Sequence, residues 1–316
     1  MISSFAGFDQ NDRAVLSIYR IAHLSDPHLP SPPGAFGWKD VFTKRLLSRI
    51  AWRRKRKVHR PEVLEALVAD LKAAAPDHVV ISGDLTNFAS RTEIDAATRW
   101  LRSLGAPSDF TVSPGNHDAQ AGVGGPERFA PWAPWLGDAG ETVFPQVRMR
   151  GPVVIFNLCS AVPTAPHLAT GRLGEEQLRG LDAALADPAY ADLFRLVVLH
   201  HPPTKGAVSK RKSLDDQEAL RAVLAKRGAD LVLHGHAHES LVGSVPGPNG
   251  SAIPVLGVPS ASVPVSGHSP ARWHAIEVSP RAEGGFHAKV VVRGIERGQG
   301  VAELGRYRLT DIDQRG

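Results

Sequence analysis

The chain has 316 residues, of which 42% are hydrophobic, enough to fill the core of one large α/β or sandwich domain. No apolar run approaches the ~20 residues that span a bilayer, no signal peptide precedes the first strand, and the single cysteine, Cys159, excludes an internal disulfide, so we expect a cytoplasmic protein. The net charge of +5 is concentrated in residues 39–60, which hold ten Lys or Arg against one acid, while the other residues hold 27 bases against 31 acids.

Apolar runs of strand length alternate with amphipathic stretches of helical length, a pattern typical of a layered α/β fold. The predicted strands are 17–25, 78–82, 110–113, 153–159, 196–199 and 230–233, and the predicted helices are 61–75, 91–104, 174–186 and 214–227. Pro61 suits a first helical turn, and Gly228 suits the end of the last helix.

After residue 241 the pattern changes to short β runs broken by Gly and Pro, at 253–258, 273–278 and 289–292. We expect this part to form a second, mostly antiparallel sheet packed on the first. No linker is long enough to require a domain boundary. The sequence therefore predicts one domain over residues 1–300, with a basic helical insertion at about 34–60 and a C-terminal tail at 301–316.

Five predicted strands end in polar residues that can bind metal. The segments are Ser25-Asp26-Pro27-His28, Ser82-Gly83-Asp84, Gly115-Asn116-His117-Asp118, His200-His201-Pro202-Pro203 and Gly235-His236-Ala237-His238. Ligand sites of open α/β sheets lie outside the carboxyl ends of the strands, so these five ends can converge on one point. Carboxylate and amide oxygens mixed with imidazoles suit Mn, Fe, Zn, Ni or Co.

These segments, in this order, resemble the pattern of the calcineurin-like metallophosphoesterase superfamily, over roughly residues 18–260. The resemblance implies an α/β (α+β) fold, a four-layer αββα sandwich of two mixed sheets flanked by helices. It also implies two metal ions that share one ligand. By the family pattern, one ion takes Asp26, His28 and His238, the other takes Asn116, His200 and His236, and Asp84 bridges the two. His201 is an alternative to His200, because each is followed two residues later by proline.

The resemblance also implies the reaction. Two such cations lower the pKa of a bridging water, so that hydroxide can attack the phosphorus near neutral pH. The family uses the histidine at the position of His117 to protonate the leaving group or to stabilise the transition state, and we expect Asp118 to orient that ring. We expect Lys205, Arg211 and His201 to contact the substrate, because they follow the fourth strand end.

Three interpretations of the basic segment at 39–60 stay open. It can be a solvated helical hairpin, a lid that binds an anionic substrate or nucleic acid, or a peripheral attachment to anionic lipid on the inner face of the membrane. Trp38 and Trp52 among the cations suit the last of these. The sequence does not decide whether the chain forms oligomers.

The main functional hypothesis is a dinuclear phosphodiesterase for a small substrate, similar to the branch that includes bacterial cyclic-nucleotide phosphodiesterases. Alternatives are hydrolysis of a lipid-linked pyrophosphate such as a UDP-diacylglucosamine, and nuclease activity. A non-catalytic scaffold that kept the fold is the least favoured, because such a scaffold is expected to lack some ligands, whereas all seven ligand positions and His117 are present here.

Overall fold

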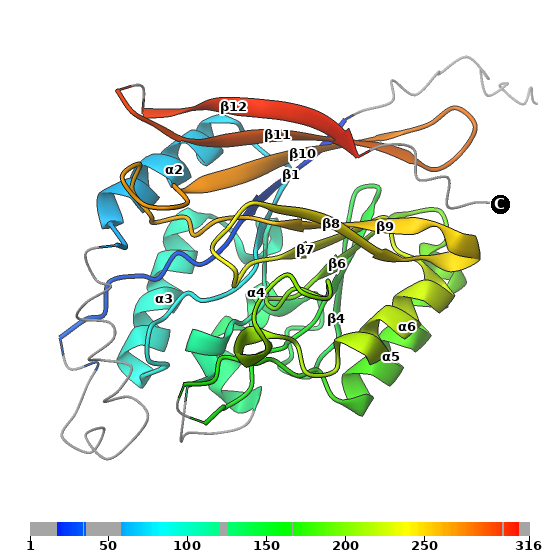
Figure 1. The fold of residues 1–316 in the computed structure, drawn as a ribbon, viewed down its shortest axis with the longest axis horizontal. Helices are drawn as coiled ribbons and strands as arrows, with labels where there is room; N and C mark the ends of the chain where they lie inside the picture. Colours follow the sequence, from blue (N-terminus) through cyan, green and yellow to red (C-terminus); the bar gives the residue numbers. More distant parts are fainter. Residues whose placement is uncertain are drawn as a thin grey trace, which may run out of the picture.

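The computed structural model describes residues 18–33, 35, 58–120, 126–165, 167–298 and 300–309. These residues form two mixed sheets of six strands each, with strand orders β12-β11-β10-β1-β2-β3 and β4-β5-β6-β7-β9-β8 (Figure 1). The first sheet contains β1 (Tyr19–Leu24), β2 (His78–Ile81), β3 (Phe110–Val112), β10 (Arg272–Pro280), β11 (Phe286–Glu296) and β12 (Gly300–Leu309). The second contains β4 (Gln146–Arg150), β5 (Val153–Asn157), β6 (Phe194–Val198), β7 (Leu231–His234), β8 (Leu241–Pro246) and β9 (Ala252–Gly257).

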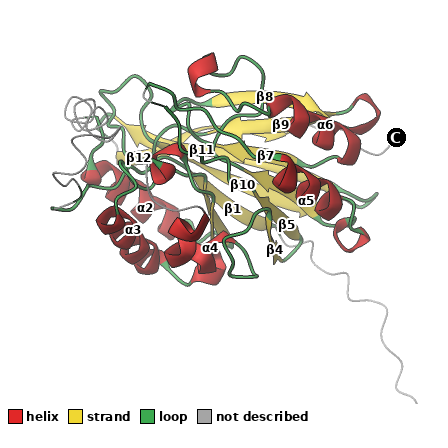
Figure 2. Cartoon of the chain, turned by 90° about the horizontal axis from the view of Figure 1, so that it is seen from below, coloured by secondary structure: helices red, strands yellow, loops and turns green. Residues whose placement is uncertain are grey.

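Five α-helices of the described residues cover the outer faces of the sheets. They are α2 (Pro61–Ala73), α3 (Arg91–Leu104), α4 (Ala133–Leu136), α5 (Glu175–Leu185) and α6 (Gln217–Arg227). Helices α2, α3 and α4 are grouped together, and α5 and α6 lie apart from them (Figure 2). Helix α3 begins at a capping box, in which the Ser90 hydroxyl accepts from the Glu93 amide and the Glu93 carboxylate accepts from the Ser90 amide.

Alternation along the strands produces three separate apolar layers. Ile21 of β1 and Val80 of β2 point between the sheets, where they pack with apolar residues of the second sheet such as Leu233. Their neighbours Ala22 and Val79 point outward, into the layer formed with α2, α3 and α4. A third layer lies between the second sheet and helices α5 and α6. Burial on both faces of both sheets gives the four-layer αββα sandwich that the family resemblance implied.

The strand directions decide where the site forms. Strands β1, β2 and β3 are parallel neighbours, and so are β5, β6 and β7. Parallel strands end at the same edge of a sheet, so the loops after β1, β2 and β3 lie together, and those after β6 and β7 lie together. An isolated bridge between Ser25 and Ser260 ties the end of β1 to the loop after β9.

The C-terminal third differs from expectation. It does not form a sheet of its own, because β9 and β8 extend the second sheet beside β7, while β10, β11 and β12 extend the first sheet beside β1. The start of the C-terminal tail, expected at residue 301, was wrong, because β12 runs to Leu309 and pairs with β11. Of the basic insertion at 34–60, residues 34 and 36–57 lie outside the described residues.

Candidate metal centre

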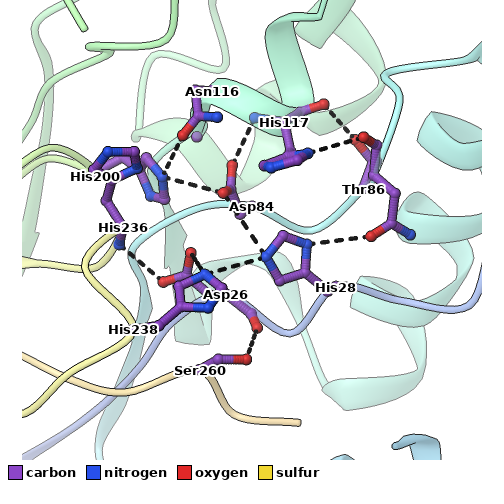
Figure 3. A network of polar contacts seen from close by, with 12 residues as sticks. Asp26, His28, Asp84, Thr86, Asn116, His117, His200, His236, His238 and Ser260 are labelled. Carbon is purple, nitrogen blue, oxygen red and sulfur yellow. Dashed lines mark hydrogen bonds and ion pairs between the residues drawn. The ribbon is translucent and has the colours of Figure 1, made fainter. Parts of the chain in front are cut away.

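Loops from both sheets bring the predicted ligands together. Figure 3 shows the side chains around Asp84, with His28 and Asp26 on one side and His200 and Asn116 on the other. Asp26, His28, Asp84 and His238 each offer one ligand atom within 4.8 Å of the others, and Asp84, His200 and His236 form a second such group. Asp84 belongs to both groups, as expected for a carboxylate between two cation positions.

The first group has short contacts between potential ligand atoms. Nε2 of His238 is 3.1 Å from Oδ1 of Asp26 and 3.3 Å from Nε2 of His28. Nε2 of His28 is 3.9 Å from Oδ2 of Asp84. Nδ1 of His28 is 3.2 Å from Oδ1 of Asn87, which orients the ring so that Nε2 faces the group.

The second group is arranged in the same way. Nε2 of His200 lies 3.3 Å from Oδ2 of Asp84 and 3.2 Å from Oδ1 of Asn116, and its Nδ1 donates to the Ser82 carbonyl oxygen at 2.7 Å. The His236 ring donates through Nε2 to the Lys212 carbonyl oxygen at 2.9 Å, so Nδ1 is the atom that it can offer to a metal. The Asn116 amide oxygen thus lies beside this group, within hydrogen-bonding distance of His200.

Five of these residues have a backbone conformation that non-glycine residues rarely adopt. Positive φ angles occur at Asp26 (51°), His28 (44°), Asp84 (55°), His236 (66°) and His238 (57°). Such a conformation has a steric cost and persists where the surrounding structure enforces it, typically at functional sites. The loops thus hold these side chains toward the centre at the expense of local backbone energy.

Two glycines allow the chain to pass close to the acids. A Cβ on Gly115 would collide with the Asp84 carboxylate, and a Cβ on Gly235 would collide with the Ser25 hydroxyl and come within 2.5 Å of Oδ2 of Asp26. The first residue of the Gly-Asn-His-Asp segment and of the Gly-His-Ala-His segment must therefore be glycine, because a side chain there would collide with its neighbours.

The acids and histidines of the site affect one another's protonation. Burial opposes ionisation of Asp84, but His200 and His117 outweigh it and hold the pKa of Asp84 well below its ordinary value. Burial opposes protonation of His200, but Asp84 outweighs it and raises the pKa of His200 to about 9. Burial, together with repulsion from His59, His117 and His238, lowers the pKa of His28.

This donor set fits metal ions. Two imidazole nitrogens 3.3 Å apart, next to buried carboxylates of lowered pKa, form a concentration of electron-pair donors that a cation would satisfy. Without a metal ion, the raised pKa of His200 favours a proton on this ring, and that positive charge offsets the charge of the buried Asp84 carboxylate. A metal ion bound by His200 would displace that proton, because a ligating imidazole is neutral.

His117 lies at the rim of the centre and is half-buried. Its backbone amide donates to Oδ1 of Asp84 at 2.7 Å, and Nδ1 of its ring lies 2.9 Å from the Asn87 carbonyl oxygen and 2.9 Å from Nε2 of Gln120. With Nδ1 donating to Asn87, Nε2 is the ring atom that can exchange a proton with a substrate.

Asp118 does not orient the His117 ring, so that expectation is wrong. Its carboxylate accepts from the backbone amides of Gly115, Thr86 and Leu85 and from the Thr86 hydroxyl. Burial, with a further contribution from Asp84, raises the pKa of Asp118 to about 7. Asp118 thus fixes the loops after β2 and β3 against each other, and Asn87 and Gln120 contact the His117 ring.

The two adjacent histidines after β6 have different surroundings. His200 faces the centre, whereas Nδ1 of the His201 ring is 2.8 Å from the Ser160 hydroxyl and Nε2 is 3.2 Å from the Ala169 carbonyl oxygen. His201 has no exposed surface, so the geometry argues against the predicted substrate contact. Lys205 and Arg211 are both exposed, and the backbone of Lys212 contacts His236, which places this cationic segment beside the site.

Sequence reasoning missed several residues that support the centre. The Ser260 hydroxyl donates to the Asp26 carbonyl oxygen at 2.6 Å, and the Ser82 and Asn87 oxygens bond the imidazoles described above. His59, which no sequence motif contains, is buried, and its ring centroid lies 4.4 Å from that of His28. In the sequence, only its position just before the predicted helix at 61–75 could have drawn attention to it.

A family model for calcineurin-like phosphoesterases matches residues 19–240, which contain every residue of the two donor groups. The chain belongs to this family. The chain is 27% identical over 285 residues to a Synechococcus protein described as a probable cyclic nucleotide phosphodiesterase, an alignment that covers 89% of this chain and 92% of that protein.

Two solved structures share the fold. A dimetal phosphatase from Danio rerio aligns with a TM-score of 0.53 at 13% identity, over 92% of this chain and 98% of its own. Purple acid phosphatase from yellow lupin seeds aligns with a TM-score of 0.54 at 12% identity, over 92% of this chain and 53% of its own. At these identities the structures establish the shared fold. None of the described helices combines the length and the apolar character needed to cross a membrane.

Proposed function

We propose that the centre binds two transition-metal ions and that the protein is a phosphodiesterase. The observation that carries the proposal is the position of Asp84 in both donor groups, because one carboxylate shared by two groups suits a pair of cations. Asp26, His28 and His238 would hold one ion, Asn116, His200 and His236 would hold the other, and Asp84 could serve both. Ions that accept oxygen and nitrogen ligands together, such as Mn, Fe, Zn, Ni or Co, suit this set.

When bound, such ions lower the pKa of water and neutralise phosphate oxygens, which is the chemistry that hydrolysis of a phosphoester requires. The protein's own contribution is to hold the ligands in place and to supply a proton. His117 is the candidate general acid, since Nδ1 is fixed by Asn87 and the ring lies at the accessible rim. Protonated at Nε2, it would give that proton to the departing alkoxide.

The diester specificity is supported by the relative described as a probable cyclic nucleotide phosphodiesterase, which is similar over most of both chains. Exposed Lys205 and Arg211 lie in the segment beside His236, where cations would attract the remaining charge of a phosphodiester. A small cyclic-nucleotide-like diester is therefore the proposed substrate.

The basic segment supports a second candidate. Residues 39–60 hold ten Lys or Arg, which suits an anionic lipid surface or nucleic acid, and so a lipid-linked pyrophosphate or a polynucleotide as substrate. Most of this segment lies outside the described residues, so a cytoplasmic enzyme that binds the membrane periphery through it stays a prediction.

A substrate panel tests the proposal. The protein, loaded with Mn²⁺, is assayed with bis(p-nitrophenyl) phosphate, p-nitrophenyl phosphate, cAMP, single-stranded DNA and a UDP-linked lipid. We expect the diester to be hydrolysed faster than the monoester, and cAMP faster than the DNA or the lipid. A preference for the monoester would overturn the diester assignment, and a preference for the UDP-lipid or DNA would favour the second candidate.

A further inference from the structure

His59 lies immediately before helix α2 and is held rigidly at the edge of the metal centre. Nδ1 of its ring is 2.8 Å from the Ser262 hydroxyl, and the next residue, Arg60, donates its amide to the Ser262 carbonyl oxygen at 2.8 Å. The ring is 8% exposed. The His59 ring and the backbone of Arg60 thus both hydrogen-bond to the loop after β9. Ser260 of the same loop contacts Asp26.

The ring faces two residues of the first donor group. Its centroid lies 4.4 Å from the His28 ring and 5.8 Å from the His238 ring. His28, His59 and His238 can each offer one ligand atom within 4.8 Å of the others. Because Ser262 holds Nδ1 of His59, Nε2 is the atom that His59 would use for a metal.

We propose that His59 is a further metal ligand, which makes His28, His59 and His238 a three-imidazole site overlapping the first donor group. The proposal rests on the dinuclear centre proposed above and extends it. A ring nitrogen binds one ion at a time, so this site shares His28 and His238 with the first metal position and adds a ligand to it instead of a third ion.

The second nitrogen of His59 supports this assignment. Ligating histidines almost always use their other ring nitrogen to bond an oxygen, which fixes the ring and the tautomer. His59 does so with Ser262, as His28 does with Asn87 and His200 with the Ser82 carbonyl. The Ser262 hydroxyl in turn lies 3.2 Å from the Ser260 hydroxyl, which donates to the Asp26 carbonyl oxygen, so His59 is connected to a residue of the first donor group.

A cavity gives an ion access to this position. It has a volume of about 260 Å³, and its lining includes His28, His59, Ser31 and Ser262. Zn²⁺, Co²⁺ and Ni²⁺ favour imidazole more than Mn²⁺ does, since Mn²⁺ suits oxygen ligands. His59 should therefore shift the selectivity of the first metal position from Mn²⁺ toward Co²⁺ and Zn²⁺.

Metal titration of His59→Ala and His59→Gln tests the inference. We expect either substitution to weaken Co²⁺ and Zn²⁺ binding at one of two sites by about tenfold or more, the scale on which loss of a ligand's partner acts. Mn²⁺ binding should change much less, and the visible absorption bands of the Co²⁺ protein should shift. His78→Gln is the matched control, because His78 is also buried and bonded to a hydroxyl, that of Thr111, but belongs to neither donor group.

The outcomes separate the two proposals. Unchanged Co²⁺ affinity and absorption in both His59 variants would overturn the inference and leave the dinuclear centre intact. Failure of the parent protein to bind two Co²⁺ ions would overturn the proposed function itself. Ser262→Ala, which keeps the His59 ring but removes the hydroxyl 2.8 Å from its Nδ1, provides a second test if the His59 variants do not fold. It should also weaken Co²⁺ binding relative to Mn²⁺, and equal affinity to the parent would count against the inference.

Discussion

The protein has two sets of histidines, one inside the β-strands and one in the loops that follow the strand ends. Nearly all of those described below are buried. Inside the strands, His23 bonds the Ser82 hydroxyl and His78 bonds the Thr111 hydroxyl. Those beyond the strand ends, such as His200 and His238, lie beside carboxylates. Burial is therefore a poor guide to a ligand.

The difference arises over one or two residues of chain. His234 still belongs to β7, and its ring bonds the adjacent Gly235 carbonyl oxygen. His236 follows the glycine, adopts a positive φ of 66° and turns toward the second donor group. The end of the regular strand thus separates a histidine that supports the fold from one that can bind metal.

The largest effect should come from the carboxylate common to both donor groups. Asp84→Ala should remove measurable turnover and reduce the bound metal below two equivalents, because each cation position loses a ligand and the neighbouring imidazoles lose their negative partner. Elemental analysis and circular dichroism check this. Asp95→Ala, on the exposed surface of α3, is the control. Two tightly held equivalents in Asp84→Ala would contradict the shared role.

The adjacent histidines His200 and His201, which follow β6, allow a direct comparison between a candidate ligand and a histidine that supports the fold. His200→Gln should lose the ion of the second group, whereas His201→Gln should keep both ions. The latter should lower the free energy of unfolding by about 1–3 kcal/mol, since it leaves Ser160 and the Ala169 carbonyl with a poorer buried partner. Metal content and urea denaturation measured on both variants separate these results. Loss of metal from His201→Gln alone would exchange the two assignments.

His117 tests whether a histidine at the rim acts on the substrate without holding metal. His117→Ala should reduce kcat by about 10²–10⁴, the range of general acid catalysis, with both ions retained. The loss should be smaller with a p-nitrophenolate leaving group, which needs no proton, than with a poorer leaving group. Steady-state rates with diesters of both kinds measure this, and an equal loss for the two would refute the general-acid role.

The strand histidines should instead affect acid stability. Burial, with repulsion from Arg148 and Arg150, lowers the pKa of His78 from 6.5 to about 3. Below pH 6.5 the unfolded chain takes up a proton that the folded protein refuses, so the free energy of unfolding falls as the pH is lowered toward 3. His78→Gln should reduce this dependence by up to about 1.4 kcal/mol per pH unit. Urea denaturation of the chelator-treated protein between pH 6 and 4 tests it, and an unaltered slope would show that His78 does not titrate this way.

The sequence by itself determined the chemistry of the strand ends and the layered fold. Near-continuous apolar runs such as that of β5 require burial on two faces, and the polar residues that follow a run must emerge at its end, since both properties are local to the chain. This local order allowed a layered α/β fold and the clustering of Asp26, Asp84 and His236 to be predicted, and the resemblance that the same segments carry implied the family and its αββα layers.

Only the tertiary structure decided which partners these local elements acquire. A strand's alternation does not specify its neighbour, so the division of β8–β9 and β10–β12 between two sheets was not readable from periodicity. The same holds for side chains: Asp118 bonds the loop after β2 instead of the imidazole beside it in sequence, and His59 reaches His28 across 31 residues of chain. These contacts depend on how distant segments pack, and packing is a property of the whole fold.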